Sequence, residues 1–195
     1  MSIITSIPKQ AMVHSEHFNI NGVVFDLEQR GINKPYKALW TSTWNDVVDE
    51  IPWIAWCKSE NFTIRDHIRL YQIIPKRNLK ILNIDTPEDY MSDDLIRIGS
   101  DETDDCIRPD FWNDDYEYSL YISYKEMKNR GFDGIHFSKN IISISHEFKM
   151  YETINGSYNP WVLNCMDCES SIWFNTNWID KVIDTRLDVL NVRRM

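Results

Sequence analysis

The segment that most constrains the fold of this chain runs from 164 to 182. Between Glu169 and Phe174 the residues alternate between two sides of the backbone, which is the period-two pattern of a half-buried strand. The turn-forming residues of 175–177 then end that strand. Glu169 is therefore predicted at the mouth of a strand, where a rigid scaffold fixes its direction and an adjoining loop leaves it open to a ligand. The alternative is a solvated glutamate that only caps the strand.

The length and composition of the chain favour one ordinary globular domain. A chain of 195 residues can bury about 70% of its unfolded surface, so we expect a single domain over 1–195. No apolar run approaches the ~20 residues of a membrane span, so no membrane contact is expected. Four Cys residues without a secretory leader favour reduced thiols in a cytoplasmic protein.

The charge of the chain is unevenly distributed. Its net charge of -9 argues against binding along a nucleic-acid backbone, which requires lysine and arginine to neutralise phosphates. Between 85 and 117 there are thirteen acidic residues and two arginines, so the rest of the chain is close to neutral. We predict a mobile acidic loop over 100–115. It is either a docking surface for a basic partner or a solvated insertion.

Three segments upstream of Glu169 carry further candidate groups. Residues 130–137, Arg-Gly-Phe-Asp-Gly-Ile-His-Phe, are typical of a glycine-containing turn that leads into a strand. Residues 37–44 are apolar and β-branched, with two tryptophans on either side of a Thr-Ser-Thr cluster. Residues 10–18 alternate as a strand does and contain His14.

The Gly-Phe-Asp-Gly-Ile segment and the tail that begins Glu169-Ser-Ser-Ile-Trp-Phe-Asn resemble, in this order, the C-terminal half of ADP-ribosyltransferase domains. The match covers about a third of the chain. The resemblance implies an α+β fold in which a split pair of small, strongly twisted sheets with flanking helices surrounds a cleft for NAD. The chain differs from the family at 26–30, which allow barely one helical turn where the family has two or three.

The same resemblance implies NAD-binding residues on the first predicted strand. His14 and Ser15 are similar to the His-Ser element of the family, whose histidine contacts the adenosine-side ribose of NAD. The alternative is a histidine that is only hydrogen-bonded at the end of a strand.

A second group of NAD-binding residues is implied on the next strand. Thr41, Ser42 and Thr43 are similar to the hydroxyl-rich element that braces the catalytic glutamate and lines the nicotinamide pocket, and Trp40 would form a stacking wall. Neutral hydroxyl groups can hold a carboxylate in one rotamer without adding charge. The alternative is that these are ordinary strand residues.

Glu169 is the predicted catalytic residue. Departure of nicotinamide leaves an oxocarbenium-like ribosyl cation, which a nearby carboxylate can stabilise. Family members that modify proteins often carry Glu or Gln two residues earlier, where this chain has the shorter Asp167. The resemblance thus implies a mono-ADP-ribosyltransferase that uses NAD, with a protein as the acceptor and a nucleic acid as the alternative acceptor.

Two other functions stay open. Water could be the acceptor, which would make the protein an NAD glycohydrolase. Alternatively, the chain is a non-catalytic interaction or inhibitor protein on the same fold, whose acidic segment 85–117 occupies a basic partner. Charge reversal within that segment would abolish partner binding under the second function and leave NAD turnover nearly intact under a catalytic one.

The remaining segments predict helices over 45–60, 86–98 and 116–130, a strand hairpin made of 67–75 and 79–84, and strands over 140–152 with a hairpin turn at Asn155-Gly156. Cys165 and Cys168 form a Cys-x-x-Cys pair, which lacks half the ligands of a structural zinc site unless His136 or His146 contributes. We therefore predict no metal site.

Overall fold

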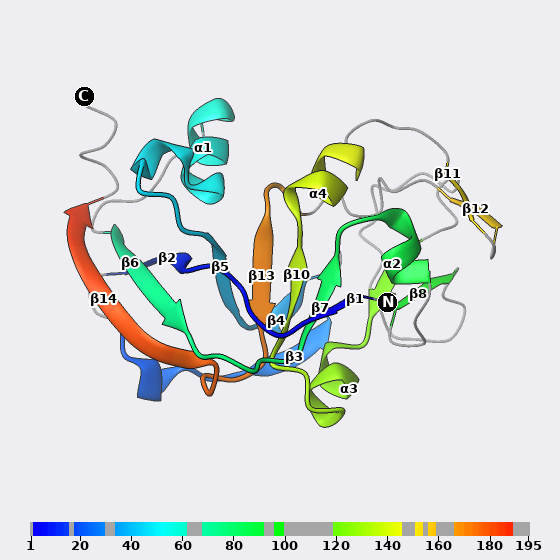
Figure 1. The fold of residues 1–195 in the computed structure, drawn as a ribbon, viewed down its shortest axis with the longest axis horizontal. Coiled ribbons are helices and arrows are strands. Elements are labelled where there is room, and N and C mark those ends of the chain that lie inside the picture. The colour runs from blue at the N-terminus through cyan, green and yellow to red at the C-terminus, as the bar shows by residue number, and fades with distance from the viewer. Residues whose placement is uncertain are drawn as a thin grey trace.

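The structure, a computed structural model of residues 1–195, describes residues 2–15, 18–29, 34–61, 68–91, 96–99, 119–145, 151–153, 156–158 and 166–188. In these ranges the protein has a mixed α+β fold, with one eight-stranded sheet, three two-stranded sheets and four α-helices (Figure 1). No helix in the described part of the chain is both long enough and apolar enough to cross a membrane.

The eight-stranded sheet forms the centre of the molecule. Its strands, in spatial order, are β1 (Ser2–Ile4), β7 (Ile81–Ile84), β10 (Gly134–Phe137), β13 (Ser170–Trp173), β5 (Leu39–Thr43), β2 (Gln10–Ser15), β6 (Ile68–Pro75) and β14 (Ile179–Asp188). Neighbouring strands are antiparallel, except that β7 and β10 are parallel.

Strand β5 joins the two halves of the sheet. Residues 39–41 of β5 pair with β13, whereas Ser42 and Thr43 pair with β2. Figure 1 shows β13, β10 and β7 on one side of this strand and β2, β6 and β14 on the other. The predicted α+β class is therefore confirmed, with one eight-stranded sheet whose two halves meet at β5.

The other elements surround this sheet. The two-stranded sheets pair β3 (Asp26–Gln29) with β4 (Pro35–Lys37), β8 (Ile96–Gly99) with β9 (Ser119–Ile122), and β11 (Tyr151–Thr153) with β12 (Gly156–Tyr158). The α-helices are α1 (Pro52–Ser59), α2 (Pro87–Met91), α3 (Tyr124–Asn129) and α4 (Lys139–Ser145), and single 3-10 turns occur at Ile20–Gly22 and Val48–Glu50.

The core has a layer on each face of the sheet, because successive strand residues point to opposite sides. On one face, Ile135 and Ile172 pack against apolar residues of α3 and α4, and Ala11 packs against α1. On the other face, Met12 and Trp173 belong to a second layer that includes strands from both halves of the sheet.

The N-terminal segment 5–9 crosses this second layer. It is anchored at one end by the Leu79 amide, which donates to the Thr5 carbonyl at 3.0 Å, and at the other by the Trp44 amide, which donates to the Lys9 carbonyl at 2.8 Å. Ile7 packs against the second core layer on the way. In Figure 1 this segment, drawn in blue, passes in front of β10 and β13. It connects strand β1 at the edge of one half with β2 in the other.

The Gly-Phe-Asp-Gly turn before β10 has a structural role. The Lys80 amide donates to Oδ2 of Asp133 at 2.9 Å, and the Asp133 carbonyl accepts from the Phe174 amide at 3.0 Å. A Cβ on Gly134 would lie 2.6 Å from the carbonyl oxygen of Ile172, so only glycine allows this close approach of β10 to β13. Asp133 therefore ties the start of β7 and the end of β13 to the turn.

The predicted hairpin of 67–75 and 79–84 is wrong. Its two strands form as β6 and β7, but β6 pairs with β2 and β14, whereas β7 pairs with β1 and β10. Ile81, Leu82 and Ile84 are fully buried, which is typical of a central strand covered on both faces. The turn after Pro75 therefore carries the chain from one half of the sheet to the other.

Several predicted helix boundaries are also wrong. The helix predicted over 86–98 ends at Met91 and is followed by β8, and the one over 116–130 is replaced by β9 and the shorter α3. The helix over 45–60 starts only at Pro52, which is tolerated in the first helical turn. Residues 139–145, within a predicted strand region, form α4, because Ile141 and Ile142 bury one helical face in the core.

Two predictions fall wholly or partly on residues that the structure does not describe. The acidic loop predicted over 100–115 lies outside the described residues, as does Asn155 of the predicted hairpin turn. On either side of that turn, β11 and β12 pair antiparallel, with Thr153 opposite Gly156. The pairing is that of the predicted hairpin.

Candidate functional site

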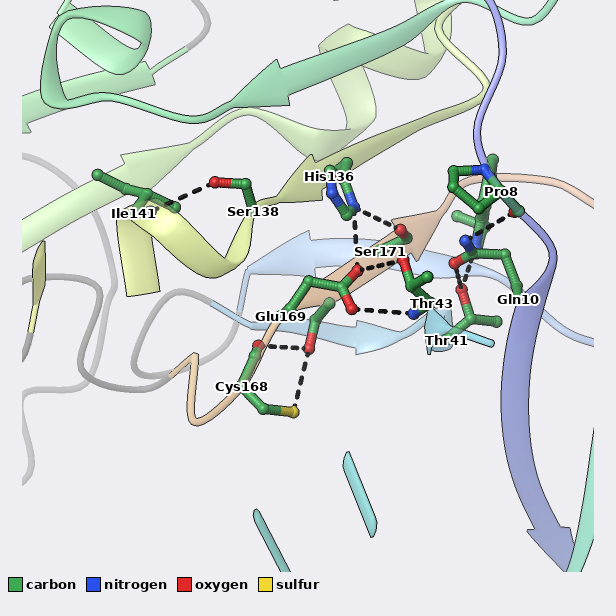
Figure 2. Close-up of polar contacts among 12 residues, drawn as sticks. Pro8, Gln10, Thr41, Thr43, His136, Ser138, Ile141, Cys168, Glu169 and Ser171 are labelled. Carbon is green, nitrogen blue, oxygen red and sulfur yellow. Dashed lines mark hydrogen bonds and ion pairs between the residues drawn. The ribbon is translucent and has the colours of Figure 1, made fainter. Parts of the chain in front are cut away.

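Glu169 lies at the end of the β13–β5 ladder, immediately before β13. Ser171 pairs with Thr41, so the antiparallel register continues to Glu169 and Thr43. The Thr43 amide donates to Oε2 of Glu169 at 2.9 Å, and the Thr43 hydroxyl donates to Oε1 at 3.1 Å (Figure 2). One residue of the neighbouring strand therefore holds both carboxylate oxygens.

The carboxyl group of Glu169 is largely removed from water, with 7% of the residue exposed. Burial raises the pKa of Glu169, because a charged carboxylate loses hydration there, and the two hydrogen bonds from Thr43 act in the opposite direction. The site thus contains a buried acid whose ionised form depends on donors supplied by β5. Perturbed acids of this kind are frequent at catalytic and binding sites.

His136 lies on β10 beside the same carboxyl group. It pairs with Ser171 across the β10–β13 ladder, and its Nδ1 lies 2.9 Å from the Ser171 Oγ and 3.5 Å from Oε1 of Glu169. Burial lowers the pKa of His136 from 6.5 to about 4, against the opposing effect of Asp85. The imidazole is therefore neutral at neutral pH, and its contact with Glu169 is not an ion pair.

The arrangement differs from a serine–histidine–acid relay. In such a relay the serine and the acid contact different ring nitrogens, so that a proton can pass through the imidazole. Here Ser171 and Glu169 both face Nδ1 of His136. Ser171 is also only 1% exposed, which leaves its hydroxyl poorly placed to attack a substrate.

Of the predicted Thr-Ser-Thr cluster, Thr43 is the residue that contacts Glu169. The Thr41 hydroxyl instead accepts from Nε1 of Trp173 and donates to Oε1 of Gln10, both at 2.7 Å. Ser42 lies between Thr41 and Thr43 in sequence, so its side chain is on the other face of the sheet, where its strand partner is Ala11. Within the cluster, Thr43 thus holds the carboxylate, whereas Thr41 links Trp173 to Gln10.

Trp40 and Asp167 each lie near Lys34. Nζ of Lys34 lies 3.5 Å from Oδ2 of Asp167 and 5.7 Å from the ring centroid of Trp40. The side chains of Lys34 and Asp167 are both more than 40% exposed, so their ion pair contributes little to stability. Strand alternation places Trp40 on the face opposite Thr41, where it packs against the first core layer.

His14 and Ser15 are on β2 but not beside Glu169. The residue of β2 that lies opposite Thr43 is Gln10, whereas His14 lies opposite Arg69. Four residues at ~3.3 Å each separate Gln10 from His14 by about 13 Å along the strand. His14 is exposed, and its ring packs edge-on against Phe18 with a centroid distance of 5.3 Å.

From the sequence, His136 is a candidate only for a zinc site, and its position beside Glu169 is not predicted. The available signal was its position between Ile135 and Phe137, which are both fully buried on the other face. Because of this alternation, the His136 ring shares a face of the sheet with every second residue of the strand that pairs with it. Which residues those are depends on the β10–β13 register.

The described residues contain no group of three or more His, Cys, Asp or Glu side chains that could hold a metal ion. Cys165 lies outside the described residues. Burial raises the pKa of the Cys168 thiol to about 12, so this group is protonated at neutral pH. Comparison with protein-family models, with curated proteins and with solved structures finds no match to this chain.

Proposed function

We propose that this protein transfers ADP-ribose from NAD to a macromolecular acceptor, with release of nicotinamide, and that Glu169 is its catalytic carboxylate. The observation that supports the proposal is that Thr43 donates a hydrogen bond to each carboxylate oxygen of Glu169. The sequence resemblance implied a hydroxyl-bearing strand that braces a glutamate, and these two predicted segments are in contact. The same resemblance favours a protein as the acceptor, with a nucleic acid as the alternative.

The proposed chemistry uses the charge of Glu169. When the bond between ribose C1′ and the nicotinamide nitrogen breaks, its electron pair leaves with nicotinamide and the ribosyl group becomes positive. A lone pair of the acceptor then forms the new bond to C1′, and the acceptor's proton goes to solvent. A fixed carboxylate in a poorly hydrated site stabilises the intermediate charge more strongly than one in water would.

The other predicted residues take different roles in this proposal. Thr43 holds Glu169 in one orientation. A flexible glutamate exposed to water would not keep a fixed orientation by itself. His14 and Ser15 are assigned to the adenosine side of NAD, because they lie well along β2 from the carboxylate. Trp40, which is half-buried, and the more exposed Asp167 are assigned to positions near Lys34, where Asp167 would meet the acceptor.

The test is transfer of label from adenylate-labelled NAD in a cell lysate. Glu169→Gln should reduce labelling at least about 100-fold, because the amide keeps the size of the side chain but lacks its negative charge. Thr43→Val, which keeps the backbone donor and loses the hydroxyl, should reduce it by about tenfold. The control is Glu126→Gln, which makes the same chemical change on the exposed surface of α3 and should leave labelling unchanged.

The outcomes separate the candidate functions. Nicotinamide release without labelled macromolecule would replace transfer by hydrolysis at the same site. Equal labelling by wild type and Glu169→Gln would remove Glu169 from catalysis, and absence of NAD consumption would overturn the enzymatic proposal. No observation on the described residues favours the acidic-inhibitor alternative, since most of its segment lies outside them.

A further inference from the structure

Glu169 has a second neighbour that the catalytic proposal does not require. Oε1 of this residue lies 3.1 Å from the Thr43 hydroxyl and 3.5 Å from Nδ1 of His136. The two groups reach it from different strands, β5 and β10, on either side of β13. Figure 2 shows the carboxylate between them.

The proton on the imidazole determines whether this contact is favourable. A neutral imidazole carries one proton, on Nδ1 or on Nε2. If Nδ1 had none, its lone pair would face the negative oxygen of Glu169, which is repulsive. With a proton on Nδ1, the ring donates toward the Ser171 Oγ at 2.9 Å and its positive edge faces Glu169. The geometry therefore favours the Nδ1–H tautomer.

Two acids act on His136. Glu169, which precedes β13, lies beside Nδ1, and the charge of Asp85, which follows β7, raises the pKa of the ring. Its cross-strand neighbours Asn83 and Ser171 are uncharged. Of these two acids, Glu169 is the one whose oxygen lies near Nδ1, and it favours a donor on that nitrogen. Burial lowers the pKa of the ring, so it supplies this donor without becoming a cation.

We propose that His136 is a positioning residue for Glu169, held as the neutral Nδ1–H tautomer, which together with Thr43 keeps the carboxylate oriented and ionised. The tautomer and the effect on Glu169 rest on the contacts of His136 and not on any activity of the protein. Only the consequence for turnover rests on the proposed transferase function. The two can therefore fail separately.

The first measurement is the tautomer, by long-range ¹H–¹⁵N NMR of the histidine rings. The chain has five histidines, and the signals of His136 are those lost in His136→Asn. We expect the pattern of a neutral ring protonated on Nδ1 at pH 7. A ring protonated on Nε2, or an imidazolium, would overturn the proposal.

The second measurement is the titration of Glu169, followed by the ¹³C shift of its carboxyl group. His136→Asn and His136→Leu have nearly the same size, but only the amide of Asn can donate near the position of Nδ1. We expect the pKa of Glu169 to stay near its wild-type value in His136→Asn and to rise by about one unit in His136→Leu. Equal values in all three proteins would show that His136 does not act on Glu169.

The kinetic arm connects this effect with turnover. If Glu169 is catalytic, His136→Leu should lower kcat about tenfold with little change in KM for NAD, and His136→Asn should restore most of the loss. A change confined to KM, or equal losses in both variants, would contradict a positioning role. If no protein consumes NAD, the transferase proposal fails while the titration still decides the role of His136.

Discussion

The two ends of the β10–β13 ladder are built on the same face of the same strands, yet burial has opposite consequences there. At one end Gly134 lies opposite Trp173, and at the other His136 lies opposite Ser171, next to Glu169. At the first end, burial stabilises the folded protein, because apolar groups leave water. The ionisable groups of the second end lose hydration, and burial shifts the pKa of both away from the charged form.

The comparison shows where this fold obtains its stability and where it gives stability up. Trp173 is fully buried and stacks on Trp178, with ring centroids 3.6 Å apart and an angle of 10° between the planes. Its Nε1 donates to Thr41, so its polar atom is also satisfied. Glu169 gains hydrogen bonds from Thr43, but burial removes the hydration of its charged form. This cost of burying ionisable groups is one reason why we propose a functional role for the site.

The largest expected effect is at the apolar end. Trp173→Ala should lower the free energy of unfolding by about 3–5 kcal/mol, because it removes the largest buried side chain of the strand and leaves a cavity beside Trp178. Urea unfolding would measure it. Trp173→Phe, which keeps a stacked ring and loses the donor to Thr41, should cost clearly less. If Glu169→Gln proved as destabilising as Trp173→Ala, the contrast between the two ends would not hold.

The next effect concerns the close approach of the strands. Gly134→Ala should cost about 2–3 kcal/mol, because the new Cβ would meet a backbone oxygen at 2.6 Å that cannot move without separating the strands. Gly131→Ala is the matched control. It meets no atom within 4 Å but has a φ of +78°, so it should cost only about 1 kcal/mol. Equal costs for the two variants would mean that backbone conformation, and not strand contact, requires Gly134.

The local elements around the site were largely predictable, because their signals are local. The alternation after Glu169 became β13, and the hydroxyl-bearing segment became β5. Partner choice was not predictable in the same way. The turn after Pro75 has the residues of a hairpin, but β7 is buried on both faces and occupies a central position in the sheet, where it pairs with β1 and β10. Such pairing depends on burial of distant segments, which a local pattern does not contain.

The site shows the same division. The contact between Glu169 and Thr43 was implied by the resemblance, because both segments belong to one recognised pattern. The resemblance implies a place for His14 on the adenosine side of NAD, and the β2–β5 register, which brings Gln10 beside Thr43, leaves that a prediction. His136 was missed because its distance from Glu169 depends on the pairing of Gly134 with Trp173, two residues further along the ladder. A shift of one residue would turn its ring to the other face.

The smallest expected effect concerns the pH dependence of stability at the polar end. The pKa of His136 falls from 6.5 to about 4 on folding, so the unfolded chain binds more protons between these values. Stability should therefore fall as the pH drops through this window, by about 2 kcal/mol between pH 7 and pH 5. Glu169→Gln with His136→Asn should lack this loss when compared with Glu169→Gln alone, because asparagine does not titrate and the Glu169 pKa no longer contributes to the difference. Urea unfolding of the two proteins at both pH values measures it. Parallel losses in both would mean that His136 is hydrated in the folded protein, and the contrast between the two ends of the ladder would then rest on Glu169 alone.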